Sequence, residues 1–253
     1  SYNIKAGRLT RQKEDKMAKY EYLILDVDDT LLNFEKCELN AFLRTLEACK
    51  IVPEERLQKL FIEICDEVWL KYDLDNTNNA DILKNYHKYY RSYAVERFVH
   101  LEEKIKTGMP PEQLSALYFQ KYKEEFCPED GAIAVCRTLS KYCQLVLATN
   151  GLAEIQRSRI SPFMNYITHV FISEEVGAIK PSSAFYSCIL NTLYVNNPAV
   201  CLMVGNSIST DIVGANEAGM DTCWYNRSRK AYNHSIKPAY EISFLPDLIQ
   251  LIK

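Results

Sequence analysis

The stretch that decides the fold covers residues 22–30 and reads Y-L-I-L-D-V-D-D-T. Its first four residues form a short apolar run, which is typical of a strand buried on both faces of a parallel sheet. The run ends abruptly in the carboxylates Asp26, Asp28 and Asp29. In an open α/β sheet, ligands bind beyond the carboxyl ends of the strands. The stretch therefore predicts a buried first strand that delivers acidic side chains to a binding site.

Similar apolar runs follow late in the chain, and segments with helical periodicity separate them. The runs cover 144–148, 168–172 and 200–204, and the helical segments cover 152–160, 182–194 and 210–219. This alternation predicts an α/β fold with a doubly wound, Rossmann-like parallel sheet. Weaker signals indicate edge strands at 222–225 and 239–242 and a closing helix at 244–252.

The middle of the chain does not alternate in this way. Helical patterns follow one another at 36–50, 54–72, 80–104 and 111–125. A block of this length exceeds an ordinary connection between strand and helix. We therefore predict an inserted all-helical cap domain over 34–128 and a catalytic core made of 17–33 and 129–253. Residues 1–16 are polar and aperiodic, and we interpret them as a leader or a tag-like extension, with both origins left open.

Composition excludes several classes of protein. The net charge of −3 argues against binding to a nucleic acid polymer. No apolar run approaches the roughly 18 residues that span a bilayer, so we expect no membrane partner. The nine cysteines form no C-x-x-C pair and the four histidines have no ligand spacing, which disfavours disulfides and zinc. We expect a cytoplasmic protein; monomer and homodimer both remain open.

Polar residues cluster at the other predicted strand ends and helix starts. They are Thr149-Asn150-Gly151, Lys180-Pro181, and Gly205-Asn206-Ser207 followed by Asp211. Taken singly, each has an ordinary interpretation as a turn, a surface lysine before a helix, or a helix cap. Their conjunction is informative, because each falls where a strand ends or a helix begins.

These residue types suit phosphoryl transfer. Two carboxylates two residues apart can divide the work, one attacking phosphorus and the other holding a proton for the leaving oxygen. Thr149, nearby backbone amides and Lys180 can surround the phosphoryl oxygens with donors and positive charge. Asp26, Asn206 and Asp211 offer oxygen ligands, which Mg²⁺ prefers together with water and substrate phosphate.

Together, D-x-D-x-T at 26–30, T-N-G at 149–151, K-P at 180–181 and G-N-S-x-x-x-D at 205–211 resemble the motifs of the haloacid dehalogenase-like (HAD) superfamily. The similarity covers essentially all of 20–253. It implies that Asp26 is the nucleophile and Asp28 the general acid/base, with the backbone carbonyl of Asp28 also bound to the metal.

The same resemblance assigns the remaining motif residues. It implies that Thr149 and Lys180 hold the phosphoryl group, and that Asn206 and Asp211 complete the magnesium shell with Asp26. The motif residues expected to contact the substrate are Thr30, Asn150 and Gly151.

Residues 215–226 (A-N-E-A-G-M-D-T-C-W-Y-N) are similar to a group of bacterial pyrimidine 5′-nucleotidases. The resemblance therefore implies a magnesium-dependent hydrolase of small phosphate monoesters that acts through an aspartyl-phosphate intermediate. Pyrimidine nucleoside monophosphates are the first candidate substrates, and another small metabolite such as a sugar phosphate is the alternative.

One position departs from the family pattern. Most phosphatases of this type have Asp where this chain has Asn206, so we expect weaker magnesium binding unless Asp211 compensates. Two rival functions stay open: a metal-free dehalogenase and a non-catalytic binder of phosphorylated ligands. Dehalogenases lack the second aspartate, so Asp28 argues against the first, and the intact motifs argue against the second.

The cap contains a stripe of tyrosines at helical spacing, Tyr86, Tyr89, Tyr90 and Tyr93. A stacking platform for a nucleobase is one interpretation. We favour packing between cap helices instead. Phe34, just past the first motif, is better placed by connectivity to contact the substrate.

Overall fold

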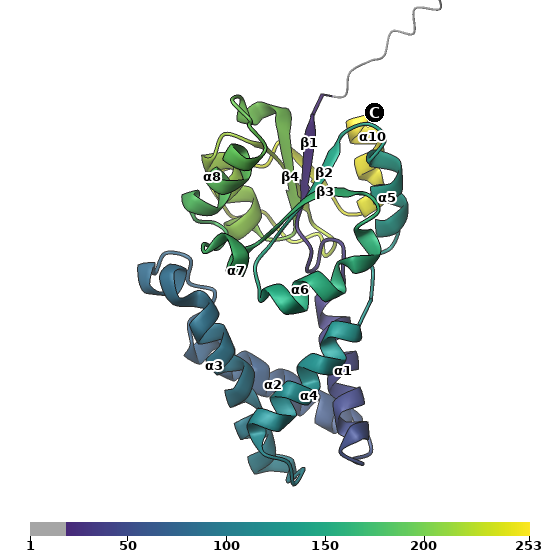
Figure 1. Ribbon diagram of the computed structural model, residues 1–253, viewed down its shortest axis with the longest axis vertical. Coiled ribbons are helices and arrows are strands. Elements are labelled where there is room, and N and C mark those ends of the chain that lie inside the picture. The colour runs from purple at the N-terminus through teal and green to yellow at the C-terminus, as the bar shows by residue number, and fades with distance from the viewer. Residues whose placement is uncertain (1–18) are drawn as a thin grey trace, which may run out of the picture.

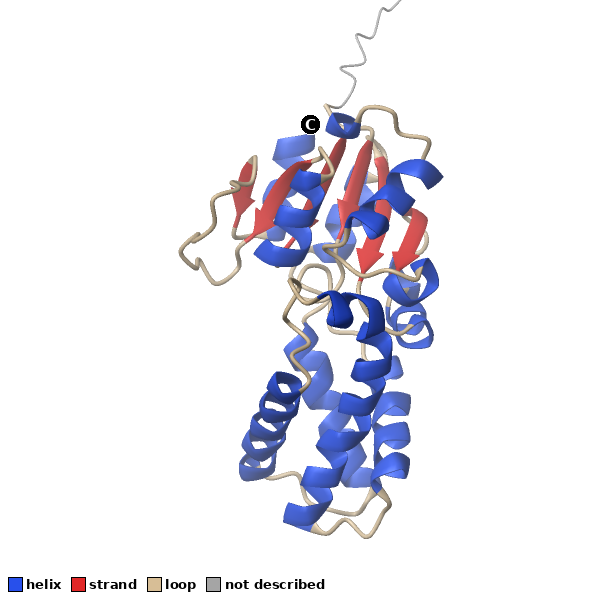
Figure 2. Cartoon of the chain, turned by 90° about the vertical axis from the view of Figure 1, so that its left-hand side faces the viewer, coloured by secondary structure: helices blue, strands red, loops and turns tan. Residues whose placement is uncertain are grey.

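The computed structural model describes residues 19–253, so the predicted extension at 1–16 lies outside the described residues. Six parallel strands form one sheet in the order β3-β2-β1-β4-β5-β6 (Figure 2). The strands are β1 (Tyr22–Leu25), β2 (Gln144–Thr149), β3 (Ile167–Ile172), β4 (Cys201–Gly205), β5 (Asp221–Tyr225) and β6 (Tyr240–Ile242). Strand order reverses between β1 and β4, as in Rossmann-like folds. The doubly wound sheet is therefore confirmed.

Side chains of the central strands alternate between two buried faces. Leu23 is paired with Leu145 and Leu202 and faces one apolar cluster, whereas its neighbour Ile24 faces the other. The first face is covered by α5 (Ala132–Leu139) and α10 (Leu248–Ile252), and the second by α8 (Ser183–Thr192) and α9 (Gly214–Glu217). Because helices cover both faces, the strands are apolar throughout, and this is the pattern that the sequence shows.

Four helices between β1 and α5 form a separate bundle around their own apolar cluster (Figure 1). They are α1 (Phe34–Ala48), α2 (Glu55–Lys71), α3 (Ala80–Ile105) and α4 (Pro111–Glu124). Phe42 and Phe61 stack at its centre with ring centroids 4.0 Å apart. The helical cap is therefore confirmed, while the boundaries at 34 and 128 stay a prediction.

The chain passes between core and cap through two neighbouring segments. Leu32 and Pro128 form an isolated antiparallel bridge. The backbone N–H of Asn33 donates to the Cys127 carbonyl at 2.8 Å, and that of Glu129 donates to the Leu31 carbonyl at 2.9 Å. The carboxyl ends of the strands point toward the bundle, and α6 (Ala153–Arg159) lies between sheet and bundle (Figures 1 and 2).

Several elements differ from the sequence-based expectations, and three of them bear on the sheet and its covering helices. β5 lies inside the sheet and not at its edge, because β6 pairs beyond it. The helix expected at 210–219 begins as a π-helix, η3 (Ile208–Val213), and continues as α9. α5 was not predicted, because its eight residues are too short and apolar to separate helix from strand. Within 19–253, no helix has the length and apolar character needed to cross a membrane.

Gly214 is expected to be required for the packing of α9 against the core. A Cβ at this position would lie 2.6 Å from Tyr186 Cε2 and 2.7 Å from Pro181 Cβ. Gly214→Ala should therefore lower the free energy of unfolding by about 1–3 kcal/mol, as overpacking does. Urea denaturation measures this change. Asn216→Ala, on the exposed side of α9, is the control and should change it by less than about 0.5 kcal/mol. Equal effects of the two substitutions would contradict the packing role.

Candidate active site

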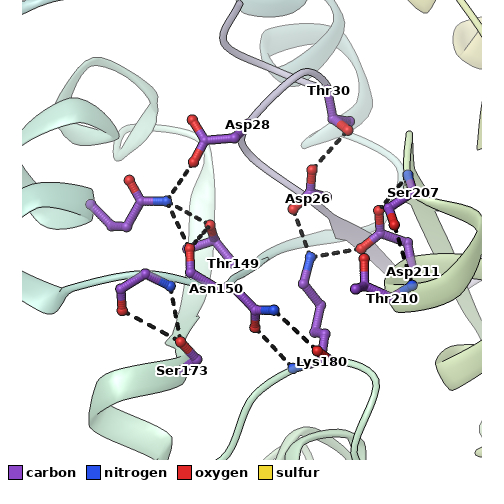
Figure 3. Close-up of polar contacts among 12 residues, drawn as sticks. Asp26, Asp28, Thr30, Thr149, Asn150, Ser173, Lys180, Ser207, Thr210 and Asp211 are labelled. Atoms are coloured by element: carbon purple, nitrogen blue, oxygen red, sulfur yellow. Dashed lines mark hydrogen bonds and ion pairs between the residues drawn. The ribbon is translucent and has the colours of Figure 1, made fainter. Parts of the chain in front are cut away.

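The centre of the site is a buried lysine between two buried aspartates (Figure 3). Lys180 Nζ donates to Asp26 Oδ1 and to Asp211 Oδ1, and both distances are 2.6 Å. Asp26 directly follows β1, Asp211 lies in η3 after β4, and Lys180 lies in the loop before α8. Since β1 and β4 are neighbours at the point where the sheet reverses, the fold itself brings the three side chains together.

The charges in this cluster do not balance. Burial raises the pKa of Asp26 to about 7, although the Lys180 ammonium opposes this rise. Burial alone would lower the pKa of Lys180, but the Asp211 and Asp26 carboxylates outweigh it and hold the pKa above its ordinary value. When both carboxylates are ionised, the protonated lysine between them leaves one negative charge uncompensated.

Local contacts fix the direction of both carboxylates. The Thr30 hydroxyl donates to Asp26 Oδ2 at 2.9 Å, and the backbone N–H of Ser207 donates to Asp211 Oδ2 at 3.0 Å. Asp211 lies so close to β4 that a Cβ on Gly205 would be 2.2 Å from Asp211 Oδ2. The glycine of the fourth motif is therefore required for this approach.

A second polar group lies on the other side of Asp26 and contains Asp28 (Figure 3). Gln156 Nε2 donates to Asp28 Oδ2 at 2.8 Å and to Thr149 Oγ1 at 2.7 Å. Arg159 is buried, and its Nη1 lies 2.7 Å from Asp28 Oδ1 and forms an ion pair with this partly exposed carboxylate. The expected acid/base and one expected phosphoryl ligand thus share contacts with a single helix, α6.

Asn150 and Gly151 shape the loops around the cluster. The Asn150 side chain accepts from the backbone N–H of Lys180 at 2.8 Å and donates to its carbonyl at 3.1 Å. The backbone N–H of Gly151 donates to Ser173 Oγ at 2.9 Å, and Gly151 has φ 141°, which favours glycine. The Asn150 amide therefore holds the Lys180 backbone in place.

The oxygen donors near Asp26 suit a hard cation. Within residues 19–253, no group of three or more His, Cys, Asp and Glu side chains forms a metal site. A cation beside Asp26 and Asp211 would therefore depend on amide and carbonyl oxygens as well, and Mg²⁺ accepts this set together with water. Asn206 follows β4, its carbonyl accepts from Trp224 Nε1, and it borders a polar cavity of about 100 Å³ together with Asp29.

A cavity of about 420 Å³ lies between the cap and the strand ends. It reaches Asp28, Asn150 and Gly151 in the core, and an adjoining cavity of about 150 Å³ reaches Lys180. The aromatic residues of its wall are Phe34, Trp69, Tyr86, Tyr90, Tyr93 and Tyr122. The volume lies in the range of small-molecule sites.

The tyrosine stripe of α3 packs the cap and lines the cavity at once. Tyr86 and Tyr93 are buried in the apolar cluster of the cap, and together with Tyr90 they also border the cavity. Tyr89 is directed elsewhere and donates to Asp81. Packing and ligand contact are therefore compatible interpretations of the same residues.

Sequence reasoning missed three polar residues of this region. Gln156 and Arg159 follow the second motif at helical spacing, so the helix after a strand end was a signal for them. His87 of the cap meets Ser173 of the core at 2.8 Å, and burial lowers the pKa of its imidazole. No sequence pattern marks His87, because the contact crosses from cap to core.

Residues 20–219 match the haloacid dehalogenase-like hydrolase family, and the chain belongs to this family. The family predicted from the four motifs is therefore confirmed. The chain is 27% identical to the HAD-hydrolase YfnB of Bacillus subtilis, and the match covers 93% of this chain and 97% of that protein. The crystal structure of YfnB bound to magnesium has a TM-score of 0.73 and covers 93% of this chain and 99% of that one, at 24% identity.

Two further relatives are phosphatases by name. Pyrimidine 5′-nucleotidase PynA of Streptococcus pneumoniae is 26% identical over 92% of this chain and 95% of its own length. N-acylneuraminate-9-phosphatase of Mus musculus is 29% identical over 93% of this chain and 96% of its own length. The protein is therefore an enzyme of the HAD-like hydrolases, with nucleotidases and other phosphatases among its relatives.

The cluster should make the stability of the metal-free protein depend on pH. The raised pKa of Asp26 means that the folded protein keeps a proton that the unfolded chain releases, so stability should fall as pH rises from about 4 to about 7. Lys180→Met removes the charge that opposes this rise in pKa. It should lower the free energy of unfolding by about 3–5 kcal/mol at pH 8, and by less at pH 5, where Asp26 is protonated.

Urea unfolding in EDTA at both pH values measures the effect. Lys141→Met, which changes an exposed lysine in the loop before β2, is the control and should leave the pH dependence unchanged. A loss of stability in Lys180→Met that is the same at pH 5 and pH 8 would contradict the electrostatic explanation.

Proposed function

We propose that this enzyme is a magnesium-dependent phosphate monoester hydrolase in which Asp26 is the nucleophile. The observation that carries the proposal is the Lys180 ammonium 2.6 Å from both Asp26 and Asp211, at the strand ends beside a cap-covered cavity. A nucleophile, a fixed cation and a second carboxylate on one edge of the sheet are the components that phosphoryl transfer requires.

The reaction proceeds in two steps. Asp26 attacks phosphorus, the ester P–O bond breaks, and Asp28 gives its proton to the leaving oxygen. Water then attacks the aspartyl phosphate, Asp28 takes a proton from that water, and inorganic phosphate leaves with Asp26 restored. Thr149 and Lys180 hold the phosphoryl oxygens during both steps.

Magnesium fits the charge and the donors of the site. With Asp26 ionised, as attack on phosphorus requires, Asp26, Asp211 and Lys180 sum to one negative charge, so a phosphate dianion would be repelled without a further cation. The Asp26 carboxylate has about four lone-pair sites, and Lys180 and Thr30 use two of them. Asp26, the Asp28 carbonyl, Asn206 and Asp211 would hold Mg²⁺, which supplies positive charge that lets phosphate approach Asp26.

The cavity favours an uncharged leaving group. Its wall carries the cap carboxylates Asp66 and Asp75, together with Glu38, which is paired with Arg97 behind the wall. Among the described residues that line it, the one basic side chain, Arg159, is paired with Asp28. A leaving group with its own carboxylate, such as an N-acylneuraminate, would meet this negative wall. A pyrimidine nucleoside is uncharged, can stack on the aromatic wall and can donate hydrogen bonds to the carboxylates. We therefore propose pyrimidine nucleoside monophosphates as substrates, with neutral sugar phosphates next.

A panel of monoesters tests the function. The enzyme with Mg²⁺ should hydrolyse p-nitrophenyl phosphate, and its kcat/KM for UMP or CMP should exceed that for N-acylneuraminate 9-phosphate by about tenfold or more. EDTA should abolish turnover. Asp26→Asn should lower kcat by about 10³-fold or more while leaving the fold intact, as far-UV circular dichroism can verify, because an amide cannot act as the nucleophile. Asp130→Asn, an exposed carboxylate in the core, is the matched control.

Each failure has a distinct meaning. Turnover of sugar phosphates with nucleotides untouched would contradict the substrate but not the reaction. Halide release from 2-haloacids without phosphatase activity would indicate a dehalogenase. Phosphate binding without turnover of any ester would indicate a non-catalytic binder.

Asn206 offers a test of the metal shell. If its side chain holds Mg²⁺ directly or through water, Asn206→Asp adds a negative charge beside the cation with nearly the same shape. The Mg²⁺ concentration for half-maximal activity should then fall about tenfold, which corresponds to about 1.4 kcal/mol. Magnesium titrations of both forms at fixed substrate measure this shift. Superimposable curves would show that Asn206 only stabilises its loop.

A further inference from the structure

Two buried polar residues of α6 have no part in the reaction as described so far. Gln156 and Arg159 are 3% and 2% exposed and lie one turn apart on the face that meets the strand ends. Gln156 Nε2 holds Asp28 Oδ2, and Gln156 Oε1 accepts from Arg159 Nη1 at 3.0 Å. Arg159 in turn contacts Asp28 Oδ1. One oxygen of the Asp28 carboxylate therefore accepts a hydrogen bond from α6, and the other lies in ion-pair contact with the same helix.

The Gln156–Arg159 pair is not explained by packing alone. Nε and Nη2 of Arg159 are buried without a hydrogen-bond partner among the described residues, and so is the Tyr122 hydroxyl. Unpaired buried donors are unfavourable, and an apolar side chain of similar length would avoid their desolvation. A residue that carries this penalty beside a reacting carboxyl is more readily explained by the reaction than by the fold.

The pair also connects Asp28 with the cap. The Arg159 guanidinium lies over the ring of Tyr122 in α4, 4.3 Å from its centroid. Phe34, at the start of α1, packs edge-on against the same tyrosine. The orientation of Asp28 is therefore supported from the core by Gln156 and from the cap through Tyr122 and Arg159.

We infer that Gln156 and Arg159 are positioning residues that aim the Asp28 carboxyl at the leaving oxygen, and that Gln156 also holds the Thr149 hydroxyl beside it. This inference rests on the proposed function. Asp28 follows the end of β1 and its side chain is 26% exposed at the cavity, so without these contacts it could adopt several rotamers. A general acid contributes only when it lies within hydrogen-bond reach of the atom that it protonates.

This role predicts a dependence on the leaving group. An alkoxide from a nucleotide or a sugar needs a proton as its bond to phosphorus breaks, whereas p-nitrophenolate leaves without one. Loss of the pair should therefore slow aspartyl-phosphate formation from alkyl esters much more than from aryl esters. A residue that merely supports the fold would slow both alike.

The experiment compares rapid-quench rates of alcohol release in the first turnover, at saturating Mg²⁺, for UMP and for p-nitrophenyl phosphate. The alkyl substrate is replaced by the best one of the panel if UMP is not turned over. Arg159→Met and Gln156→Met should each slow release from the alkyl ester about 10- to 100-fold and from the aryl ester less than about threefold. Arg157→Met is the matched control, because Arg157 lies on the same helix and pairs with Glu175 at the surface.

A double-mutant cycle with Asp28→Asn separates positioning from a direct effect. If Arg159 acts through Asp28, Arg159→Met should slow the alkyl ester less than about threefold once Asp28 is replaced. Additive losses, or equal losses on both esters in the single variants, would overturn the inference.

If Arg159→Met fails to fold, Arg159→Lys serves in its place. It keeps the positive charge but not the planar guanidinium, and it should still raise the aryl-to-alkyl rate ratio. Absence of turnover by the unaltered enzyme would refute the proposed function instead.

Discussion

The site depends on one shared ammonium group. Neither Asp26 nor Asp211 would be stable as a buried ion without Lys180, and Lys180 would not be stable in the interior without them. The backbone around the three side chains is shaped to let them meet. Gly205 leaves room for Asp211, and the Asn150 amide fixes the Lys180 backbone. The motifs are thus parts of one electrostatic arrangement, assembled where the sheet reverses its order.

The sequence predicted the sheet and the cap because their signals are local. Four apolar runs that end in polar residues identified β1 to β4, and helical periodicity placed the cap helices within a few residues of their observed ends. The rule that ligands bind at the carboxyl ends of parallel strands then brought together Asp26, Lys180 and Asp211. Lys180 was expected as a phosphate ligand; its contact with both aspartates was not foreseen.

What the sequence did not predict depends on contacts between distant elements. The position of β5 inside the sheet follows from the pairing of β6, which a short and weak pattern does not specify. Gln156 and Arg159 contact Asp28 because one particular face of α6 is packed against the end of β1. The sequence does not show which face of the helix this is. The aromatic wall of the cavity combines side chains from all four cap helices, and the periodicity of a single helix does not predict how the four are arranged around the cavity.

The chain leaves the core at Leu32 and returns to it at Pro128, and these two residues are neighbours. The sheet therefore does not depend on the length or the fold of the segment between them. The core requires only that the two ends of the inserted segment lie side by side, at the spacing of an antiparallel pair. Segments whose ends lie this close can be exchanged or lengthened at little cost to the rest of a fold. The bundle can therefore be exchanged as one continuous segment of the chain. In evolution, the same α/β core can in this way acquire a different cap, and with it a different substrate, while its strand ends stay unchanged.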